Sequence, residues 1–451
     1  MKIGFEIHEQ MHTESKLFCE CPTNYRDVDP NTNVCPVCTG MPGAKPSPPN
    51  KKAIESAIEI ALMLDCDIVT QKPIHIQRKH YDYPDLPSGY QRTSLPIAEN
   101  GELAGVRIRE VHIEEDPGKY DPVQGKVDFN RSGIPLVEII TKPDIKSPEE
   151  AREFLQSLIR TLEYTNKIRP EPSTLRADTN ISLEGGQRVE IKNINSVKGA
   201  FKALKYEVMR QKRTEKVERE TRSYLESQMI TVPMRSKEIA DDYRYIPDPN
   251  LLPILINQKQ VSEIKNNMYE APHLRKKRII EEYGIEENVA EVLVSEREFV
   301  DLFEEVAKEV DPNFASKWLK NRLRKVLNYL EMPPKQIPFS IEQLTKLLKM
   351  IKSEEITPEK GELILREMVK NPDDPEKILE KLGLEEMEKS KLERSVEEVI
   401  NENEEAVEDF KNGKDEALNY LSGQVMKKTE GKADPREVMK LLKKLLEEQG
   451  E

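Results

Sequence analysis

The stretch VRIREVHIEE, residues 106–115, indicates the fold class of the first half of the chain, because apolar and charged residues alternate along it. Alternation of this kind is typical of a β-strand with one side on a core and the other toward polar surroundings. Short alternating or apolar runs recur as KVDFN, IPLVEIIT and RVEIKNIN, with turn sequences such as Ser132-Gly133 and Gly185-Gly186 nearby. We therefore predict a large, mainly antiparallel sheet up to about residue 255.

Three segments of this region have helical character instead. Apolar residues recur at three- and four-residue spacing in 51–64 and 148–164. Ser147 followed by Pro148 is typical of a helix N-terminus, with the serine as the cap and the proline in the first helical position. The charged segment 197–226 predicts a third, longer helix. The first half is therefore predicted to be α+β.

The second half of the chain has helical patterns, and strand patterns fade beyond about residue 290. The stretch MPPKQIPFS, residues 332–340, contains three prolines and marks a boundary. We predict three parts: a sheet-based domain over 1–290, a helical domain with a Pro-rich linker over 291–339, and a helical tail over 340–451.

The overall composition limits the partners that the chain can have. Of its 451 residues, 34% are charged and 6% are aromatic, and the net charge is −13. This balance argues against general positive potential, so any nucleic acid would be met by local basic patches. No apolar run approaches the length of a bilayer span, and the start MKIGFEIHEQ has no signal-peptide pattern. We expect a cytoplasmic protein without a membrane partner.

The most basic stretch of the tail is GQVMKKTEGKADPREVMKLLKK. Its final helix is predicted to open at Asp434-Pro435 and to carry one apolar face. The basic side chains are either a solvated helix face or a surface that contacts nucleic-acid phosphates. The candidates for phosphate contact are Lys427, Lys428, Lys432 and Arg436.

Four of the five cysteines lie close together in the sequence, as Cys19-x-Cys21 and Cys35-x-x-Cys38. Two close pairs separated by a loop can aim four sulfurs at one Zn²⁺ ion. Four thiolates leave no open coordination position, so the ion would be structural. The alternative is a pair of disulfides, which a reducing cytosol disfavours.

Acidic residues occur in several segments whose pattern predicts strands. Glu6 and His8 alternate in GFEIHE, so both project from the same side of one strand. A lone carboxylate inside an apolar strand is costly to bury, so several such segments suggest one shared site. The other candidates are Glu114, Glu115, Glu138 and Asp178, with Lys192 following.

Carboxylates with a single imidazole suit Mg²⁺ better than a soft metal. Mg²⁺ at such sites completes its shell with water and substrate phosphates, which indicates phosphoryl transfer from a nucleotide. The alternative is a set of unrelated, solvent-facing charges on half-exposed strands.

The segment RKHYDYPDLPSGYQ, residues 78–91, interleaves cations with tyrosines. Such a combination suits phosphate binding with stacking on a base or ribose, and it equally suits an ordered loop. The candidates here are Arg78, Lys79 and Tyr81. The chain has no G-x-x-x-x-G-K-[ST] loop, no kinase-type loop followed by DFG, and no Ser-Gly-rich amidase run. Any ATP is therefore not bound in the manner of P-loop proteins.

Taken together, these segments resemble the GatB/GatE family of subunits of tRNA-dependent amidotransferases. The resemblance covers nearly the whole chain, and motifs of this length and order are highly specific. The matching stretches are GFEIHEQMHTESKLFC, NTNVCPVCTGMPGAKP, RKHYDYPDLPSGYQ, HIEEDPGK, VDFNRSGIPLVEIITKPDIKSPEEA, LRADTNIS, VEIKNINS, MRSKEIADDYRYIPDP, NENEEAVEDFKNGK and GQVMKKTEGKADP.

The resemblance implies a cradle-shaped catalytic domain, a helical domain and a YqeY-like tail that binds tRNA. It implies a ligase of protein biosynthesis that uses ATP and Mg²⁺ to phosphorylate the side-chain carboxylate of Glu-tRNA(Gln), Asp-tRNA(Asn) or both. Ammonia would then displace the phosphate. The ammonia would come from glutamine hydrolysis in an A-type amidase subunit, within a heterotrimer that includes a small C-type subunit.

The resemblance also assigns roles to the candidate residues. The Mg²⁺ shell would be Glu6, His8, Glu115 and Glu138, and the active site would add Asp178. Glu114 and Glu115 would stand where ammonia enters. Which carboxylate binds metal and which deprotonates ammonium stays open. The ATP phosphates would be held by Arg78, Lys79, Tyr81 and Lys192, the structural Zn²⁺ by Cys19, Cys21, Cys35 and Cys38, and tRNA by Lys427, Lys428, Lys432 and Arg436.

Two alternatives remain at this point. One is a GatE-type subunit that lacks the family's insertion, although MITVPMRSKEIADDYRYIPDP runs on continuously and favours the GatB type. The other is a zinc-stabilised scaffold that presents tRNA without chemistry. The retained acidic motifs argue against the scaffold, because phosphate binding favours bases over carboxylates.

Overall fold

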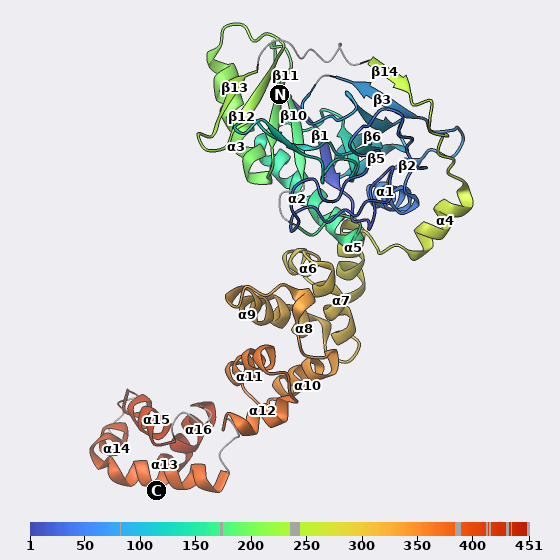
Figure 1. Ribbon diagram of the computed structural model, residues 1–451. Helices are drawn as coiled ribbons and strands as arrows, with labels where there is room; N and C mark the ends of the chain where they lie inside the picture. The colour runs from blue at the N-terminus through green and yellow to red at the C-terminus, as the bar shows by residue number, and fades with distance from the viewer. Residues whose placement is uncertain are drawn as a thin grey trace. The chain divides into compact units, whose positions relative to one another are not determined.

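The computed structural model divides into two compact units, Met1–Leu274 and Arg275–Glu451 (Figure 1). The first unit contains the sheet and the second is helical, so the predicted α+β class is confirmed. The residues that the structure describes are 1–81, 83–171, 175–234, 244–383, 389–411, 414, 416–429, 433 and 435–448.

A 12-stranded, mainly antiparallel sheet forms the first unit. Its main path runs β13-β12-β11-β10-β1-β9-β6-β4-β3-β14, with β2 and β5 attached through β6, and β7 and β8 form a separate hairpin. Among the described strands, the β11 and β12 pair alone is parallel. The strands are β1 (Lys2–Gln10), β2 (Asp67–Ile68), β3 (Ile76–His80), β4 (Tyr90–Ser94), β5 (Ala98–Leu103), β6 (Val106–Glu115), β7 (Lys119–Asp121), β8 (Lys126–Asp128), β9 (Pro135–Thr141), β10 (Arg176–Ser182), β11 (Val189–Ile194), β12 (Glu220–Leu225), β13 (Ile230–Pro233) and β14 (Arg244–Pro247).

Helices pack on the apolar side of the central strands. The ring of Phe5 on β1 stacks on Phe154 of α2 with centroids 6.1 Å apart. Ser147 caps α2 by accepting a hydrogen bond from the Glu150 amide, as the sequence predicts. Because alternate residues of a strand face opposite sides, Glu6 and His8 project away from this core. The helices are α1 (Lys51–Met63), α2 (Pro148–Thr165), α3 (Val197–Arg213) and α4 (Gln258–Asn267).

The prediction of one long helix over 197–226 is wrong in its second part. Helix α3 ends at Arg213, and Thr214 is extended. Residues 220–225 instead form β12, which pairs with both β11 and β13. The buried Arg222 side chain donates to Thr231 on β13, so tertiary pairing outweighs the helical propensity of the charged residues.

The second unit consists of helices over its described residues. Several begin with proline after a capping side chain, for example Asp311-Pro312 in α8 and Thr357-Pro358 in α11. None of the described helices combines the length and apolarity that crossing a membrane requires. The elements are α5 (Pro272–Tyr283, which starts in the first unit), α6 (Glu287–Leu293), α7 (Arg297–Val306), α8 (Pro312–Trp318), η2 (Leu319–Leu323), α9 (Arg324–Tyr329), η3 (Pro334–Gln336), α10 (Ile341–Lys352), α11 (Pro358–Lys370), α12 (Pro375–Lys381), α13 (Lys389–Glu402), α14 (Glu404–Lys411), α15 (Glu416–Lys428) and α16 (Pro435–Glu448).

The last four helices share a small apolar core of their own. Val438, Leu442 and Leu446 of α16 pack in it with Leu421 and Val425 of α15. The apolar face predicted for the final helix is therefore confirmed.

Candidate active site

The register of the sheet gathers charged residues on one face. Glu6 on β1 lies opposite Asp178 on β10, and His8 lies opposite Glu138 on β9. Residues paired across neighbouring strands project to the same face. The carboxylates that the sequence places on separate strands are therefore brought together by the pairing.

His8, Glu114 and Glu138 form the first cluster. His8 Nε2 lies 3.3 Å from Glu114 Oε2 and 3.5 Å from Glu138 Oε1. Glu114 is 1% exposed and Glu138 is 6% exposed. One ligand atom from each of the three residues lies within 4.8 Å of the others, which is close enough for one ion.

Glu6, Asp178 and Glu190 form a second cluster beside it, on β1, β10 and β11, with ligand atoms also within 4.8 Å of one another. Lys192 Nζ lies 3.5 Å from Asp178 Oδ2 and 3.7 Å from Glu190 Oε1. The lysine balances part of the negative charge of this cluster.

A cavity of about 290 Å³ opens next to both clusters. His8 and Asp178 line it from the carboxylate side. Lys79, Tyr81 and Lys192 also line it, so three of the four residues predicted to bind phosphate reach the pocket. A cavity with cations, a tyrosine and carboxylates at its wall can hold a polyphosphate together with a divalent cation.

The charges of the first cluster influence one another strongly. Burial by itself would lower the pKa of His8, but its hydrogen bonds with the carboxylates of Glu114 and Glu138 raise that pKa well above the ordinary value. Burial would raise the pKa of Glu114, yet the hydrogen bond from His8 and the charge of Lys79 lower it to about 2. A positive charge at this position is therefore strongly stabilised by the protein.

In the second cluster, the pKa values of two carboxylates are raised, whereas that of Glu114 in the first cluster is lowered. Burial is the main cause that raises the pKa of Glu6, and the neighbouring Glu138 raises it further. Burial also raises the pKa of Asp178, against the charge of Lys192. The positive charge near these carboxylates is too small to favour the ionised form of all of them.

Glu115 and Arg78 do not reach this pocket. Arg78 lies opposite Arg92, while Lys79 lies opposite Gln91, so the arginines occupy the other face of β3 and β4. Glu115 Oε1 accepts hydrogen bonds from the Arg92 amide at 3.0 Å and from its guanidinium at 3.2 Å.

The buried carboxylate of Asp248 joins the two arginines. It accepts from Arg78 Nε at 2.9 Å and from Arg92 Nε at 2.9 Å. We call Arg78, Arg92, Glu115 and Asp248 the arginine cluster. Its geometry gives no support to Glu115 as a ligand of the metal that His8 and Glu138 would hold, whereas Glu114 occupies that position.

The donor set of the first cluster fits Mg²⁺. Two carboxylates and one imidazole leave coordination positions for water and substrate phosphates, the usual arrangement for this ion. The buried Glu114 and Glu138 need a positive charge beside them, because isolated buried carboxylates are costly. His8, with its raised pKa, supplies that charge as an imidazolium, and Mg²⁺ bound to the neutral imidazole would supply it instead. His8, Glu114 and Glu138 are thus the residues that could hold the ion.

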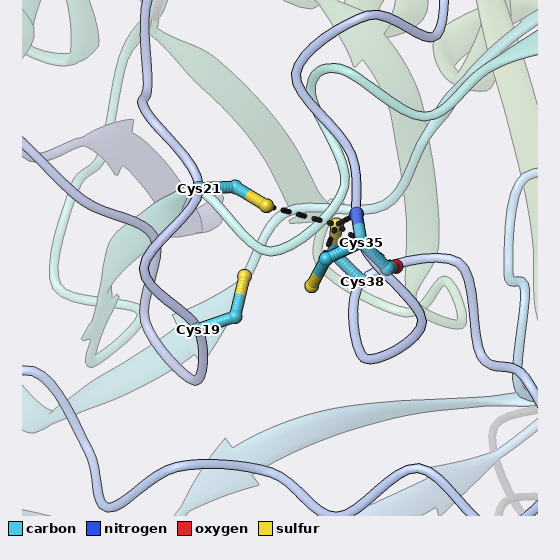
Figure 2. A group of neighbouring side chains, drawn as sticks. All are labelled: Cys19, Cys21, Cys35 and Cys38. Atoms are coloured by element: carbon cyan, nitrogen blue, oxygen red, sulfur yellow. Dashed lines mark hydrogen bonds between the residues drawn. The ribbon is translucent and has the colours of Figure 1, made fainter.

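The four clustered cysteines converge as the sequence predicts (Figure 2). Their sulfurs all lie within 4.8 Å of one another, and Cys38 Sγ is 4.0 Å from Cys21 Sγ and 3.9 Å from Cys35 Sγ. Sulfurs around a tetrahedral Zn²⁺ lie about 3.8 Å apart, given Zn–S bonds of about 2.3 Å. None of the cysteines forms a disulfide. The arrangement fits zinc. We call residues 19–38 the zinc knuckle.

The sulfurs of this knuckle are not equivalent. A hydrogen bond from Cys19 is the largest cause that lowers the pKa of Cys38 to about 5, and the nearby Lys16 contributes. Burial is the largest cause that raises the pKa of Cys21 to about 12. Cys38 is therefore the first of these two thiols to ionise.

The tail residues predicted to contact tRNA lie at the ends of two helices. Lys427 and Lys428 are at the end of α15, and Arg436 is in the first turn of α16. Lys428 Nζ pairs with Glu398 at 2.9 Å and with Glu402 at 2.7 Å. Lys432 lies outside the described residues.

Several residues of the pocket were not among the predicted site residues. Glu190 completes the second cluster, and its alternation with Lys192 is a usable signal. Gln91 is buried and donates to Glu114 Oε2 at 3.2 Å, while Arg176 lines the pocket and pairs with Asp116 at 3.3 Å. Nothing in the local sequence distinguishes Gln91 from its neighbours, because its role depends on strand pairing.

The fold and the pocket define a class: a protein with a carboxylate and lysine site on an antiparallel sheet, suited to a nucleotide and a divalent cation. Residues 1–262 match the GatB/GatE catalytic domain, and residues 301–446 match the GatB domain. The chain belongs to the GatB/GatE family.

Curated relatives match over their full length. The chain is 55% identical to the B subunit of the aspartyl/glutamyl-tRNA(Asn/Gln) amidotransferase of Methanothermobacter thermautotrophicus, over 98% of this chain and 99% of the relative. It is 54% identical to the protein of the same name from Methanocaldococcus jannaschii, over 99% and 98%. For the Methanopyrus kandleri protein of that name, identity is 51% over 100% and 99%.

Proposed function

We propose that the chain is the B-type subunit of an amidotransferase that converts Glu-tRNA(Gln), Asp-tRNA(Asn) or both to the amidated form. It is the subunit that activates the side-chain carboxylate with ATP and Mg²⁺. The partners are an A-type amidase and a small C-type subunit, and the complex works in the cytoplasm. The observation that carries this proposal is the pocket that combines His8, Asp178, Lys79 and Lys192 beside two carboxylate clusters.

In the first step, an oxygen of the substrate carboxylate attacks the γ-phosphorus of ATP. The bond from that phosphorus to the bridging oxygen breaks, ADP leaves, and an acyl phosphate forms. Lys79 and Lys192 supply positive charge to the transferring phosphoryl group. His8, Glu114 and Glu138 would hold Mg²⁺, which would supply positive charge to the phosphate oxygens.

In the second step, ammonia attacks the acyl carbon and phosphate leaves. The nitrogen loses one proton, for which the carboxylates of the pocket are the available acceptors. Three neighbouring cavities support entry from the side of the zinc knuckle. A cavity of about 10 Å³ shares Gln91 and Pro117 with the pocket, and shares Tyr90 and Arg92 with a cavity of about 340 Å³. Glu115 lines the narrow cavity, in keeping with a place on the ammonia route.

The accessory parts have separate proposed roles. The zinc knuckle holds a structural Zn²⁺ through Cys19, Cys21, Cys35 and Cys38. The cradle spans 1–290, the helical domain and linker span 291–339, and the YqeY-like tail over 340–451 contacts tRNA. The tail's exposed Lys427 and Arg436 support that contact.

The decisive experiment is reconstitution of the complex. The chain is co-expressed with an A-type and a C-type subunit and supplied with Glu-tRNA(Gln), ATP, Mg²⁺ and glutamine, and the amino acid released from the tRNA is identified. We expect glutamine, and none without ATP. Asp-tRNA(Asn) is tested in parallel to define the substrate range.

The scaffold alternative predicts a different result. A complex that assembles and binds both tRNAs but amidates neither would reject the proposed chemistry. Co-purification with an asparaginase-like partner in place of an amidase would instead assign the chain to the GatE type.

A further inference from the structure

Lys16 is a buried lysine next to the zinc knuckle. Its residue is only 1% exposed, which is rare for an ammonium group because burial of an unbalanced charge is costly. It precedes Cys19 by three positions and belongs to neither carboxylate cluster. The environment of this ammonium therefore needs an explanation of its own.

The ammonium group has three polar contacts. Lys16 Nζ lies 2.9 Å from the Asn33 carbonyl, 3.2 Å from the Phe129 carbonyl and 3.4 Å from Cys38 Sγ. An ammonium has three N–H donors, so these contacts account for all of them. Within the described part of the chain, no carboxylate lies within ion-pair distance of Lys16. The sulfur is thus the one group among the three acceptors that can carry negative charge.

The charge of a loaded knuckle matches this arrangement. Four thiolates and one Zn²⁺ carry a net charge of −2, and Cys19 and Cys38 are buried. A buried ammonium against one sulfur offsets part of that charge where water cannot. A hydrogen bond of this kind also weakens the sulfur as an electron donor to the metal.

We propose that Lys16 is the positioning residue of the zinc centre: its ammonium is the buried counter-charge of the thiolates, and it clamps them to the turn at residues 129–133. The inference rests on the proposed zinc assignment. The test measures metal binding at the cysteines and does not depend on amidation.

The turn at 129–133 packs against Lys16 and Cys38. Gly133 has a φ of +83°, and a Cβ there would lie 3.5 Å from Lys16 Cδ and 3.6 Å from Cys38 Cβ. The Ser132 hydroxyl donates to the Cys38 carbonyl at 2.8 Å, and the Leu17 amide donates to the Gly133 carbonyl at 2.7 Å. The turn leads directly into β9, which carries Glu138.

The test compares Lys16→Met with wild type in the assembled complex, loaded with Co²⁺ in place of zinc. Loss of the counter-charge makes the sulfurs stronger donors, so the sulfur-to-cobalt charge-transfer band should shift to lower energy. In parallel, competition with a coloured chelator should show zinc affinity lower by about 10- to 100-fold, because the buried, negatively charged loaded site loses the ammonium that offsets part of its charge.

Three further variants distinguish the effect of the charge of Lys16 from the effect of its size and shape. Lys16→Gln removes the charge but keeps an N–H donor. Its sulfur-to-cobalt charge-transfer band should shift in the same direction as that of Lys16→Met. If Lys16→Met does not fold, Lys16→Gln replaces it in the test. Lys16→Arg should stay closer to wild type. Lys51→Met, on the exposed start of α1, is the control and should change neither readout.

Two results would overturn the proposal. If Lys16→Gln and wild type had the same band and the same zinc affinity, the counter-charge role would be rejected while the zinc site would stand. If wild type bound neither zinc nor cobalt at the cysteines, both the zinc assignment and the role of Lys16 would fall, whatever the amidation assay showed.

Discussion

The two faces of the sheet carry polar clusters of different kinds, and adjacent residues of one strand belong to different clusters. Lys79 and Glu114 belong to the face with the carboxylate pocket. Their sequence neighbours Arg78 and Glu115 belong to the arginine cluster on the other face. On the pocket face, five carboxylates of the two clusters gather around a cavity. In the arginine cluster, two guanidinium groups and two carboxylates balance each other.

This difference indicates that the pocket face serves ligand binding and that the arginine cluster serves the stability of the fold. Buried carboxylates in excess of cations are costly unless a ligand supplies charge, whereas a balanced buried cluster is complete without one. We therefore expect changes on the pocket face to reduce activity and changes in the arginine cluster to reduce stability. Four measurements test that distinction.

The largest effect is expected for Glu138→Gln. The change removes a carboxylate charge beside His8 with little change in shape, so the cation at this position loses one of its carboxylate partners. Amidation by the reconstituted complex should fall on the order of 1,000-fold. Binding of tRNA, measured by filter retention, should be unchanged.

Glu115→Gln is the matched control for Glu138→Gln. It removes a carboxylate from β6, the strand that pairs with β9, but on the other face, where Arg92 is its partner. With ammonium replacing glutamine for both variants, which bypasses the ammonia route that Glu115 lines, the folded fraction of Glu115→Gln should amidate at nearly the wild-type rate. Equal losses in both variants would mean that the two faces do not have separate roles.

The next effect concerns the stability of the arginine cluster. Asp248→Asn leaves the buried Arg92 and the partly buried Arg78 without the carboxylate they share, and should lower the free energy of unfolding by about 3 kcal/mol. Burial would raise the pKa of Asp248, but hydrogen bonds from Arg78, the Asn250 amide and Arg92 lower it below its ordinary value of 3.8.

The lowered pKa fixes the sign of the pH dependence. The ionised Asp248 stabilises the fold above about pH 4, and that contribution is lost as the pH falls through the lowered pKa. The gap between wild type and Asp248→Asn in urea unfolding should therefore be constant from pH 7 to about pH 4 and shrink below it. A gap that widens in acid would contradict the assigned ion pairs.

A third prediction compares neighbours on β3. Lys79→Met removes a cation from the pocket wall and should lower kcat/KM for ATP on the order of 100-fold, because phosphoryl transfer needs charge at its oxygens. Arg78→Met should lower the melting temperature with a much smaller change in kcat/KM. The reverse pattern would restore Arg78 as the phosphate ligand.

Although it predicted helix where β12 lies, the sequence predicted several strands, among them β1, β6 and β9, and the sharing of a face within each, because both follow from a period of two. It therefore placed Glu6 with His8 correctly. It could not choose between Glu114 and Glu115, or between Arg78 and Lys79, because one position of register exchanges the faces. Those choices depend on pairings such as Arg78 with Arg92 and on Asp248, which lies 156 residues from Arg92.

The cysteine cluster was predictable for a different reason. Its spacing within twenty residues is local, so two short loops fix the geometry whatever the rest of the fold does. The role of Lys16 was not predictable, because the Phe129 carbonyl that it contacts is 113 residues away. Local chemistry is visible in the sequence, and contacts between distant segments are not.

The smallest effect applies the same distinction to the tail. Lys428 is already paired with Glu398 and Glu402, whereas Lys427 has no ion pair with any described residue and is exposed. If the tail contacts tRNA phosphates, Lys427→Ala should weaken tRNA binding by about three- to five-fold and lower the salt slope by about one. Lys428→Ala should change affinity less, because its charge is partly neutralised before tRNA arrives. Fluorescence titrations from low to moderate salt measure both quantities, and a larger loss for Lys428 would show that its carboxylate partners yield to phosphate.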